Sequence, residues 1–331
     1  MKNLLLKIFI VSLFLTPGLS QAYQLYLSPG ADITITATPA NPGPYQDVVI
    51  KIQSYSYDLD RSLVSWQKDG KQLASNGGLK TFAFRTGPAG SQTIIGLTIN
   101  SQTGEGPTQA IITFSPIEIE LLWQANSYTP YWYQGKAQPS ENAQIMVSAI
   151  IQAKDSKGKE VSPQFLIYNW KKDGKNLPDV SGVGKSSLLI KGGAIGSTSK
   201  IEVAVSSSDQ SISSGASTDI KIVKPKVIFY EDKPLVGTAW QKTLNKESNI
   251  NGQMVVRAEP FYFSNKNLLN FAWYLNNQKI ASDDQNPARL YLKASKKNVS
   301  SRISLRVTHP SHFLQDVSNS LIITSNSSGS F

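Results

Sequence analysis

A phrase of nine residues occurs three times in this chain of 331 residues. It reads SWQKDGKQL at residues 65–73, NWKKDGKNL at 169–177 and, in a more divergent copy, AWYLNNQKI at 272–280. The tryptophans of the three copies, Trp66, Trp170 and Trp273, are 104 and 103 residues apart. A fixed period of about a hundred residues is typical of tandem domains.

The phrase also predicts the fold of each copy. The tryptophan is followed by Asp-Gly at 69–70 and 173–174, a pair that tolerates the positive φ angles of a tight hairpin, and by the weaker substitute Asn-Asn at 276–277. In immunoglobulin-like sandwiches, a tryptophan on a central strand fills the space between the two sheets. We therefore expect Trp66, Trp170 and Trp273 to be structural core residues.

Alternating apolar residues flank each tryptophan, and helical periodicity is absent. This period-two pattern predicts half-buried antiparallel strands. The expected inward sets are Val48, Ile50, Ile52, Met146, Ser148, Ile150, Met254 and Val256 before the tryptophans, and Ile95, Leu97, Ile99, Ile201, Val203, Val205, Ile303, Leu305 and Val307 after them. The predicted fold class is all-β, with three tandem immunoglobulin-like antiparallel β-sandwiches after a signal peptide.

Residues 1–22 resemble a secretory signal peptide. Lys2 and Lys7 accompany an apolar run over 8–15, and Ser20 and Ala22 are small residues suited to cleavage after Ala22. The run is short for a permanent membrane span, although a retained anchor is the alternative. No later segment approaches the length of a span. We expect an exported chain with an extracellular, cell-surface or periplasmic location. The absence of cysteine favours a bacterial envelope protein held by apolar cores.

Domain boundaries are expected where a final strand meets a proline, at Pro116 and Pro225. The predicted domains are 23–116, 117–223 and 224–331, the last with a short disordered tail. Neither joint contains a Gly/Ser linker, so we expect a semi-rigid rod.

The tryptophan hairpin resembles those of immunoglobulin-like and PKD-like surface modules, without the paired cysteines of antibody domains. The segments SYSYDLDRSLVSW, LLWQANSYTPYWYQGKA and VIFYEDKPLVGTAW are similar to uncharacterised secreted three-module proteins of candidate-phylum bacteria. The likeness covers most of the chain after residue 22. It implies the architecture and no known activity.

Three motifs suggest chemistry that their surroundings do not support. GVGKSS at 182–187 resembles a phosphate-binding loop but has Asp179 where a glycine is needed, so we expect a sandwich turn. His309 and His312 could bind a metal, but they lack further ligands nearby and are expected at the surface. Asp58 and Asp60 could contribute to a calcium site, with a solvated loop as the favoured interpretation. We expect no cofactor, no metal and no enzymatic activity.

Five aromatic residues crowd into the segment 123–133: Trp123, Tyr128, Tyr131, Trp132 and Tyr133. An offset of 107 residues aligns Trp123 and Tyr133 with aromatic residues of the third domain, which favours packing within their own domain. Tyr131 and Trp132 have no aromatic counterparts. They are therefore the candidates for stacking on a sugar or docking a partner.

Positive charge is concentrated in the third domain. Residues 224–331 hold fourteen basic and seven acidic residues, whereas residues 23–116 hold six of each. Part of the excess is expected on one hairpin, at Arg289, Lys293, Lys296, Lys297, Arg302 and Arg306. Such a face could attract an anionic envelope polymer, with nucleic acid a less expected partner, or could only keep the domain soluble.

The sequence thus predicts a non-enzymatic exported protein that acts as a rod-like adhesion or scaffold module. The expected partners are an envelope or surface protein, or a neutral or anionic glycan. One alternative is a carbohydrate-binding protein that uses the aromatic residues of the second domain. Another is a secreted hydrolase with carboxylates converging across a domain joint.

Overall fold

The structure, a computed structural model, describes residues 23–56, 58–101, 106–153, 159–209, 212–294 and 298–327. The expected signal peptide lies outside these residues. No helix within them is long and apolar enough to cross a membrane.

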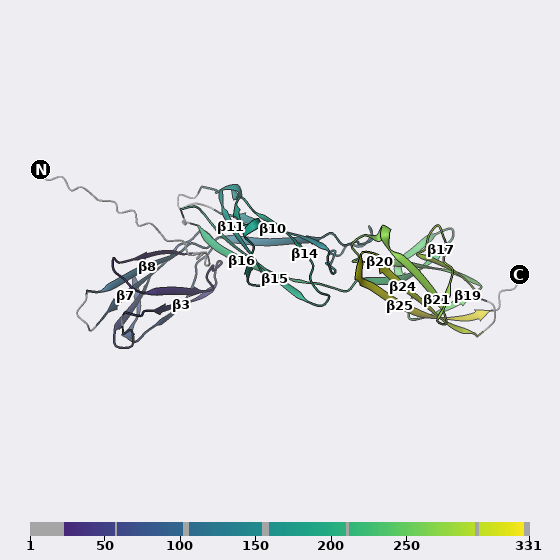
Figure 1. The fold of residues 1–331 in the computed structure, drawn as a ribbon, viewed down its shortest axis with the longest axis horizontal. Helices are drawn as coiled ribbons and strands as arrows, with labels where there is room; N and C mark the ends of the chain where they lie inside the picture. The colour runs from purple at the N-terminus through teal and green to yellow at the C-terminus, as the bar shows by residue number, and fades with distance from the viewer. Residues whose placement is uncertain are drawn as a thin grey trace. The chain divides into compact units, whose positions relative to one another are not determined.

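Three pairs of β-sheets follow one another along the chain (Figure 1). The first sandwich contains sheet 1A, of order β1-β8-β7-β4-β5, and sheet 1B, of order β2-β3-β6. Its strands are β1 Gln24–Leu27, β2 Thr34–Thr38, β3 Asp47–Gln53, β4 Leu63–Lys68, β5 Lys71–Gly77, β6 Thr81–Arg85, β7 Thr93–Asn100 and β8 Thr108–Phe114.

The second sandwich contains sheet 2A, of order β12-β11-β15-β16 with β13 beside β11, and sheet 2B, of order β14-β10-β9. Its strands are β9 Glu118–Ala125, β10 Gln144–Gln152, β11 Ile167–Lys172, β12 Lys175–Asn176, β13 Gly182–Val183, β14 Ser187–Lys191, β15 Thr198–Ser206 and β16 Ser213–Lys221, with short 3₁₀ turns at η1 Pro163–Phe165 and η2 Pro178–Val180.

The third sandwich contains sheet 3A, of order β19-β25-β24-β21-β22, and sheet 3B, of order β18-β17-β20-β23. Its strands are β17 Lys226–Lys233, β18 Gly237–Thr243, β19 Glu247–Asn251, β20 Gln253–Phe261, β21 Asn270–Leu275, β22 Gln278–Ile280, β23 Arg289–Lys293, β24 Ser300–His309 and β25 His312–Ser327, with a 3₁₀ turn at η3 Lys266–Leu268. These three sandwiches confirm the predicted all-β fold class, although β19 and β25 of sheet 3A pair in parallel.

The chain separates into two compact units. Unit 1 contains the described residues up to 118, with 152–169 and 204–215, and unit 2 contains 119–151, 170–203 and the described residues from 216 onward. Within unit 1, the start of β16 bonds to the end of the first sandwich, since the amide of Ser213 donates to the Ser115 carbonyl over 3.2 Å. The Ser214 hydroxyl lies 3.2 and 3.0 Å from the carbonyl oxygens of Pro42 and Ile117.

The three tryptophans of the repeated phrase are fully buried, as predicted, with exposed fractions of 0, 1 and 1%. Each indole N–H donates to a carbonyl on the chain about fourteen residues further on. The acceptors are the carbonyl oxygens of Leu79 for Trp66, Lys185 for Trp170 and Pro287 for Trp273, at 3.1, 2.8 and 2.9 Å. Each ring therefore fills the core and also satisfies its polar group, which an aromatic residue in a core requires.

The hairpin that follows each tryptophan has the predicted geometry. Asp69, Asp173 and Asn276 all adopt φ angles near +50°. Each side chain also accepts a hydrogen bond from a backbone amide of the next core strand: Ile94 for Asp69, Lys200 for Asp173 and Arg302 for Asn276, at 2.9, 2.8 and 2.8 Å. The first residue of each turn therefore links the hairpin after the tryptophan to the next core strand by a side-chain hydrogen bond. Turn propensity alone does not reveal this role.

The inward face of β10 differs from the prediction. Met146 and Ile150 are 46 and 47% exposed, whereas Ile145, Val147 and Ala149 are buried. The buried set is wholly apolar, whereas the expected set contains Ser148 and is flanked by Gln144 and Gln152, so the prediction chose the more polar of the two faces. Because side chains alternate between the two faces of a strand, choosing the wrong set assigns every side chain of the strand to the wrong face.

Candidate functional site

The aromatic segment 128–133 lies against the third sandwich, within unit 2. The amide of Tyr128 donates to the carbonyl of Phe263, and the amide of Tyr262 donates to the carbonyl of Tyr128, both over 2.7 Å. Tyr262 adopts a φ of +66°, which is rare for a bulky residue. This reciprocal pair of bonds fixes the backbone of the segment beside the end of β20.

Trp132 is half-buried among rings of the third sandwich rather than fully exposed. Its ring stacks on Trp240 at 5.0 Å and contacts Tyr230 and Phe261 edge-on at 5.6 and 5.9 Å. The indole Nε1 is buried and has no hydrogen-bond partner in the described part of the chain. Trp132 is therefore held in place by packing, and its contact with a sugar or a partner stays a prediction.

Tyr133 also packs outside the sandwich to which the sequence assigned it. Its ring meets Phe261 edge-on at 5.4 Å, and its hydroxyl lies 3.0 Å from that of Tyr262. Burial, together with this hydrogen bond, raises the pKa of Tyr262 to about 12. Tyr133 is packed, as expected, but against the third sandwich rather than its own.

A polar group completes the aromatic cluster. The Tyr128 hydroxyl donates to Glu259 over 2.6 Å, and Glu259 is only 5% exposed. Arg257 lies 3.6 Å from the same carboxylate and places its guanidinium 4.7 Å from the centroid of the Trp240 ring. Burial, followed by the bond to Glu259, raises the pKa of Tyr128, so the phenol stays a neutral donor at physiological pH. The buried carboxylate is thus both paired and hydrogen-bonded, as burial requires.

Two of the five aromatic residues between 123 and 133 remain apart from this cluster. Tyr131 is 91% exposed, so it is available as a surface candidate. Trp123 is half-buried in β9, with the Lys136 ammonium 3.3 Å from its ring centroid. Burial lowers the pKa of Lys136.

The basic residues of the third sandwich do not lie on one hairpin. Arg289 and Lys293 belong to β23 in sheet 3B, whereas Arg302 and Arg306 belong to β24 in sheet 3A. These two strands therefore belong to different sheets, as β6 and β7 do in the first sandwich. Lys296 and Lys297 lie outside the described residues. The prediction of a single basic hairpin is therefore wrong.

Two of these arginines are also engaged in ion pairs. The Arg289 Nε lies 2.7 Å from an oxygen of Asp232, which is largely buried. The Arg306 Nε lies 3.0 Å from both oxygens of Asp316, in a fork-like contact to which the second guanidinium nitrogen contributes. This pairing raises the pKa of Arg306 and lowers that of Asp316. Arg302, by contrast, is exposed and has no acidic partner among the described residues.

A polar groove lies on the outer face of sheet 3A, beside Arg302. Its volume is about 550 Å³, and its lining includes Lys246, Glu247, Arg302, Ser304, Ser318, Ser320 and Ile322. The lining residues come from β24, β25 and the start of β19, which are far apart in the sequence. This groove cannot be seen in the sequence, because only the pairing of these strands brings Lys246 and Arg302 into one lining.

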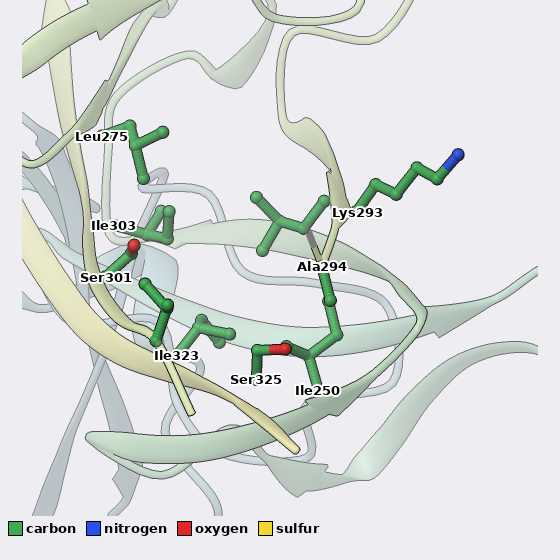
Figure 2. A pocket seen from close by; sticks show the side chains of 10 residues that line it. Ile250, Leu275, Lys293, Ala294, Ser301, Ile303, Ile323 and Ser325 are labelled. Atoms are coloured by element: carbon green, nitrogen blue, oxygen red, sulfur yellow. The ribbon is translucent and has the colours of Figure 1, made fainter. Parts of the chain in front are cut away.

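A second, apolar pocket opens at one end of the third sandwich (Figure 2). Ile250, Ile303 and Ile323 line it, and Lys293 extends away from it (Figure 2). Its volume of about 150 Å³ is below the roughly 300 to 1,000 Å³ of pockets that hold drug-sized ligands. We therefore do not assign it a ligand.

The two histidines form a close pair, and one of them is not at the surface. His309 is 4% exposed, and its ring centroid lies 4.5 Å from that of His312. The Nδ1 atom of His309 accepts from the amide of Ser311 over 3.2 Å. Burial, followed by the neighbouring His312, lowers the pKa of His309. The prediction of a surface position is therefore wrong for His309.

The remaining motifs have the structures that their simpler interpretations predicted. Residues 184–186 form the turn between β13 and β14, with φ angles of +133° at Gly182 in β13 and +69° at Gly184. Asp58 and Asp60 face cations of the protein itself, Arg61 at 3.6 Å and Lys80 at 2.8 Å respectively. No cluster of three or more metal-ligating side chains occurs within the described residues.

Comparisons with known proteins find similarity at the level of architecture. No family model and no curated protein matches the chain. Similar solved structures include the three N-terminal domains of the bacteriophage RB49 Highly Immunogenic Outer Capsid protein, at 11% identity and a TM-score of 0.25, over 92% of this chain and 99% of that one. The central fibronectin-III array of RIM-binding protein matches at 12% identity and a TM-score of 0.30, over 91% and 95%. Sidekick-1 immunoglobulin domains 1–5 match at 12% identity and a TM-score of 0.27, over 89% of this chain and 59% of that one. We base no functional argument on likenesses this distant.

Proposed function

We propose that this chain is a non-enzymatic, exported scaffold or adhesion protein of the cell surface. In this proposal, residues 23–116, 117–223 and 224–331 are three modules that act as spacers and present their outer faces to partners. The observation that supports the proposal is that the aromatic segment 128–133 packs against the third sandwich. Trp132 and Tyr133, which could have served a binding site, hold the segment to the third sandwich. A contact built in this way stiffens a joint, which is what a spacer requires.

The aromatic contact can be tested by limited proteolysis of the full chain. Trp132→Ala removes three ring contacts, so we expect faster cleavage within residues 126–136 and a loss of about 1 to 3 kcal/mol of local stability. Tyr131→Ala is the matched control, because Tyr131 is almost fully exposed and should change neither quantity. Equal cleavage rates in the two variants would remove the structural support for the proposal.

The functional class is tested by pull-down from isolated bacterial envelopes, with and without competing sugars. A scaffold or adhesion protein retains envelope components and turns over no glycan or peptide substrate. Competition by neutral sugars that is lost in Tyr131→Ala would instead support a carbohydrate-binding protein that uses the second sandwich. Turnover of any substrate would overturn the proposal in favour of a hydrolase.

A further inference from the structure

The groove on sheet 3A is formed by the outward side chains of paired strands. In the β24–β25 ladder, Arg302 faces Ile322 and Ser304 faces Ser320. The intervening residues Ile303, Leu305 and Leu321 point into the core and are buried. Since directly paired residues lie on the same face of a sheet, the arginine and the serines share the outer face. Lys246 and Glu247 complete the groove from the start of β19.

Two cations in this groove lack an acidic partner within the described residues. Arg302 and Lys246 are both exposed, and neither is engaged in an ion pair there. Their neighbour Arg306, in contrast, is already engaged by Asp316. An arginine that is free of internal partners can bind a carboxylate through two parallel hydrogen bonds, and a nearby lysine adds a point charge.

The serine hydroxyls of the groove are also available. On other ladders, directly facing hydroxyls bond to each other: Ser65 with Ser75 at 2.8 Å and Ser148 with Ser187 at 3.0 Å. Ser304 and Ser320 face each other in the same way, but their hydroxyls make no such bond in the part of the chain that the structure describes. Each can therefore donate to, and accept from, a ligand in the groove.

We propose that this groove binds a carboxylate-bearing polysaccharide, that is, a glycan containing uronic acids. Arg302 and Lys246 would take the carboxylates, and the hydroxyls of Ser304, Ser318 and Ser320 would bond to those of the sugars. Glu247, on the groove wall, disfavours a polymer as densely charged as DNA, which carries one charge per about 1.7 Å of duplex. This proposal rests on the proposed function and names the ligand class for the third module.

The test is binding of the full chain to soluble polygalacturonate, with dextran and duplex DNA as competing probes. We expect binding to polygalacturonate that weakens as salt rises, because the exposed charges are screened. Arg302→Ala should weaken it about tenfold, the loss of one charge-assisted bidentate contact. Lys226→Ala, which removes an exposed charge from sheet 3B of the same sandwich, is the matched control and should change it less than about twofold.

Two further variants separate a built groove from net charge. Ser304→Ala combined with Ser320→Ala leaves the charge unchanged and should weaken binding a few-fold. Glu247→Gln should strengthen binding. Equal effects of Arg302→Ala and Lys226→Ala, tighter binding of DNA, or no binding at low salt would each overturn the proposal. Continued retention of envelope components in the pull-down would then show that the proposed scaffold role stands without it.

Discussion

The outer faces of sheets 1A and 3A are built on equivalent central ladders, β4–β7–β8 and β21–β24–β25, but differ in chemistry. On sheet 1A the facing outward pairs include Tyr26 with Ile111 and Gln109 with Thr98. No charged residue occupies the outward positions of the described strands β1, β8, β7 and β4. On sheet 3A the outward pairs of β24 and β25 include Arg306 with Ser318 and Thr308 with Asp316.

The inward faces of the same two sheets are nearly interchangeable. Ile95, Leu97 and Ile99 of β7 occupy the positions of Ile303, Leu305 and Val307 of β24, and all six are buried. Each set packs beside the tryptophan of its own sandwich. The comparison shows that the repeat preserves the core, while the outer face of each copy is free to acquire its own charge and binding groups.

The largest expected effect concerns the tryptophan that each of the two cores contains. Trp66→Ala and Trp273→Ala should each destabilise their own sandwich by about 3 to 5 kcal/mol, because a buried indole and its hydrogen bond are lost. Denaturant-dependent hydrogen exchange of the full chain, followed on peptides from each sandwich, measures both costs. Tyr26→Ala on the outer face of sheet 1A is the control and should cost less than about 0.5 kcal/mol. A large cost for only one tryptophan would break the equivalence of the two cores.

The fold could be predicted because its determinants are local. Burial of Trp66 and the positive φ angles at 69–70 follow from residue types within one short phrase. The prediction was wrong on β10, because it followed Met146 and Ile150 although their set contains Ser148, whereas the wholly apolar set Ile145, Val147 and Ala149 is the buried one.

The candidate site was less predictable because it depends on strand pairing. Arg289 and Arg302 are close in the sequence but lie on different sheets, whereas Lys246 and Arg302 line one groove from distant segments. Trp132 lacked an aromatic counterpart at the repeat offset and was therefore assigned to the surface. Its partners Trp240 and Phe261 belong to the next sandwich, which a comparison between repeats cannot reveal.

A smaller effect should distinguish the two sandwiches in mild acid. The pKa of His309 is lower in the folded chain than in the unfolded chain, so the unfolded chain binds the proton more readily. The stability contributed by the neutral imidazole is therefore present above the unfolded value of about 6.5 and is lost as pH falls below it. The neighbouring titratable group is His312, whose ring centroid lies 4.5 Å from that of His309.

We therefore expect hydrogen exchange, corrected for its intrinsic pH dependence, to rise in β24 and β25 between pH 7 and pH 5. Peptides of the first sandwich, which contains no histidine, should not change in this range. His309→Gln should remove the difference. An equal response in both sandwiches would assign the acid sensitivity to other groups.

The smallest effect concerns the hairpin after each tryptophan, where the first sandwich has Asp69 and the third has Asn276. Burial raises the pKa of Asp69, but the hydrogen bonds from Lys68 and from the amide of Ile94 outweigh it, so the pKa lies below its ordinary value. The stability contributed by this carboxylate is then present above the unfolded value of about 3.9 and is lost as pH falls toward the folded value. Asn276 accepts the equivalent bond from Arg302 without titrating.

Between pH 5 and pH 3 we expect the amide of Ile94 to lose protection against exchange, while the amide of Arg302 keeps it. Asp69→Asn should make the first hairpin as insensitive to acid as the third. Asp69→Ala and Asn276→Ala should each cost about 1 kcal/mol at neutral pH, because both leave a strand amide without its acceptor. Acid sensitivity that persists in Asp69→Asn would show that another carboxylate of the first sandwich is responsible, and that the two hairpins do not differ in the way their anchoring residues predict.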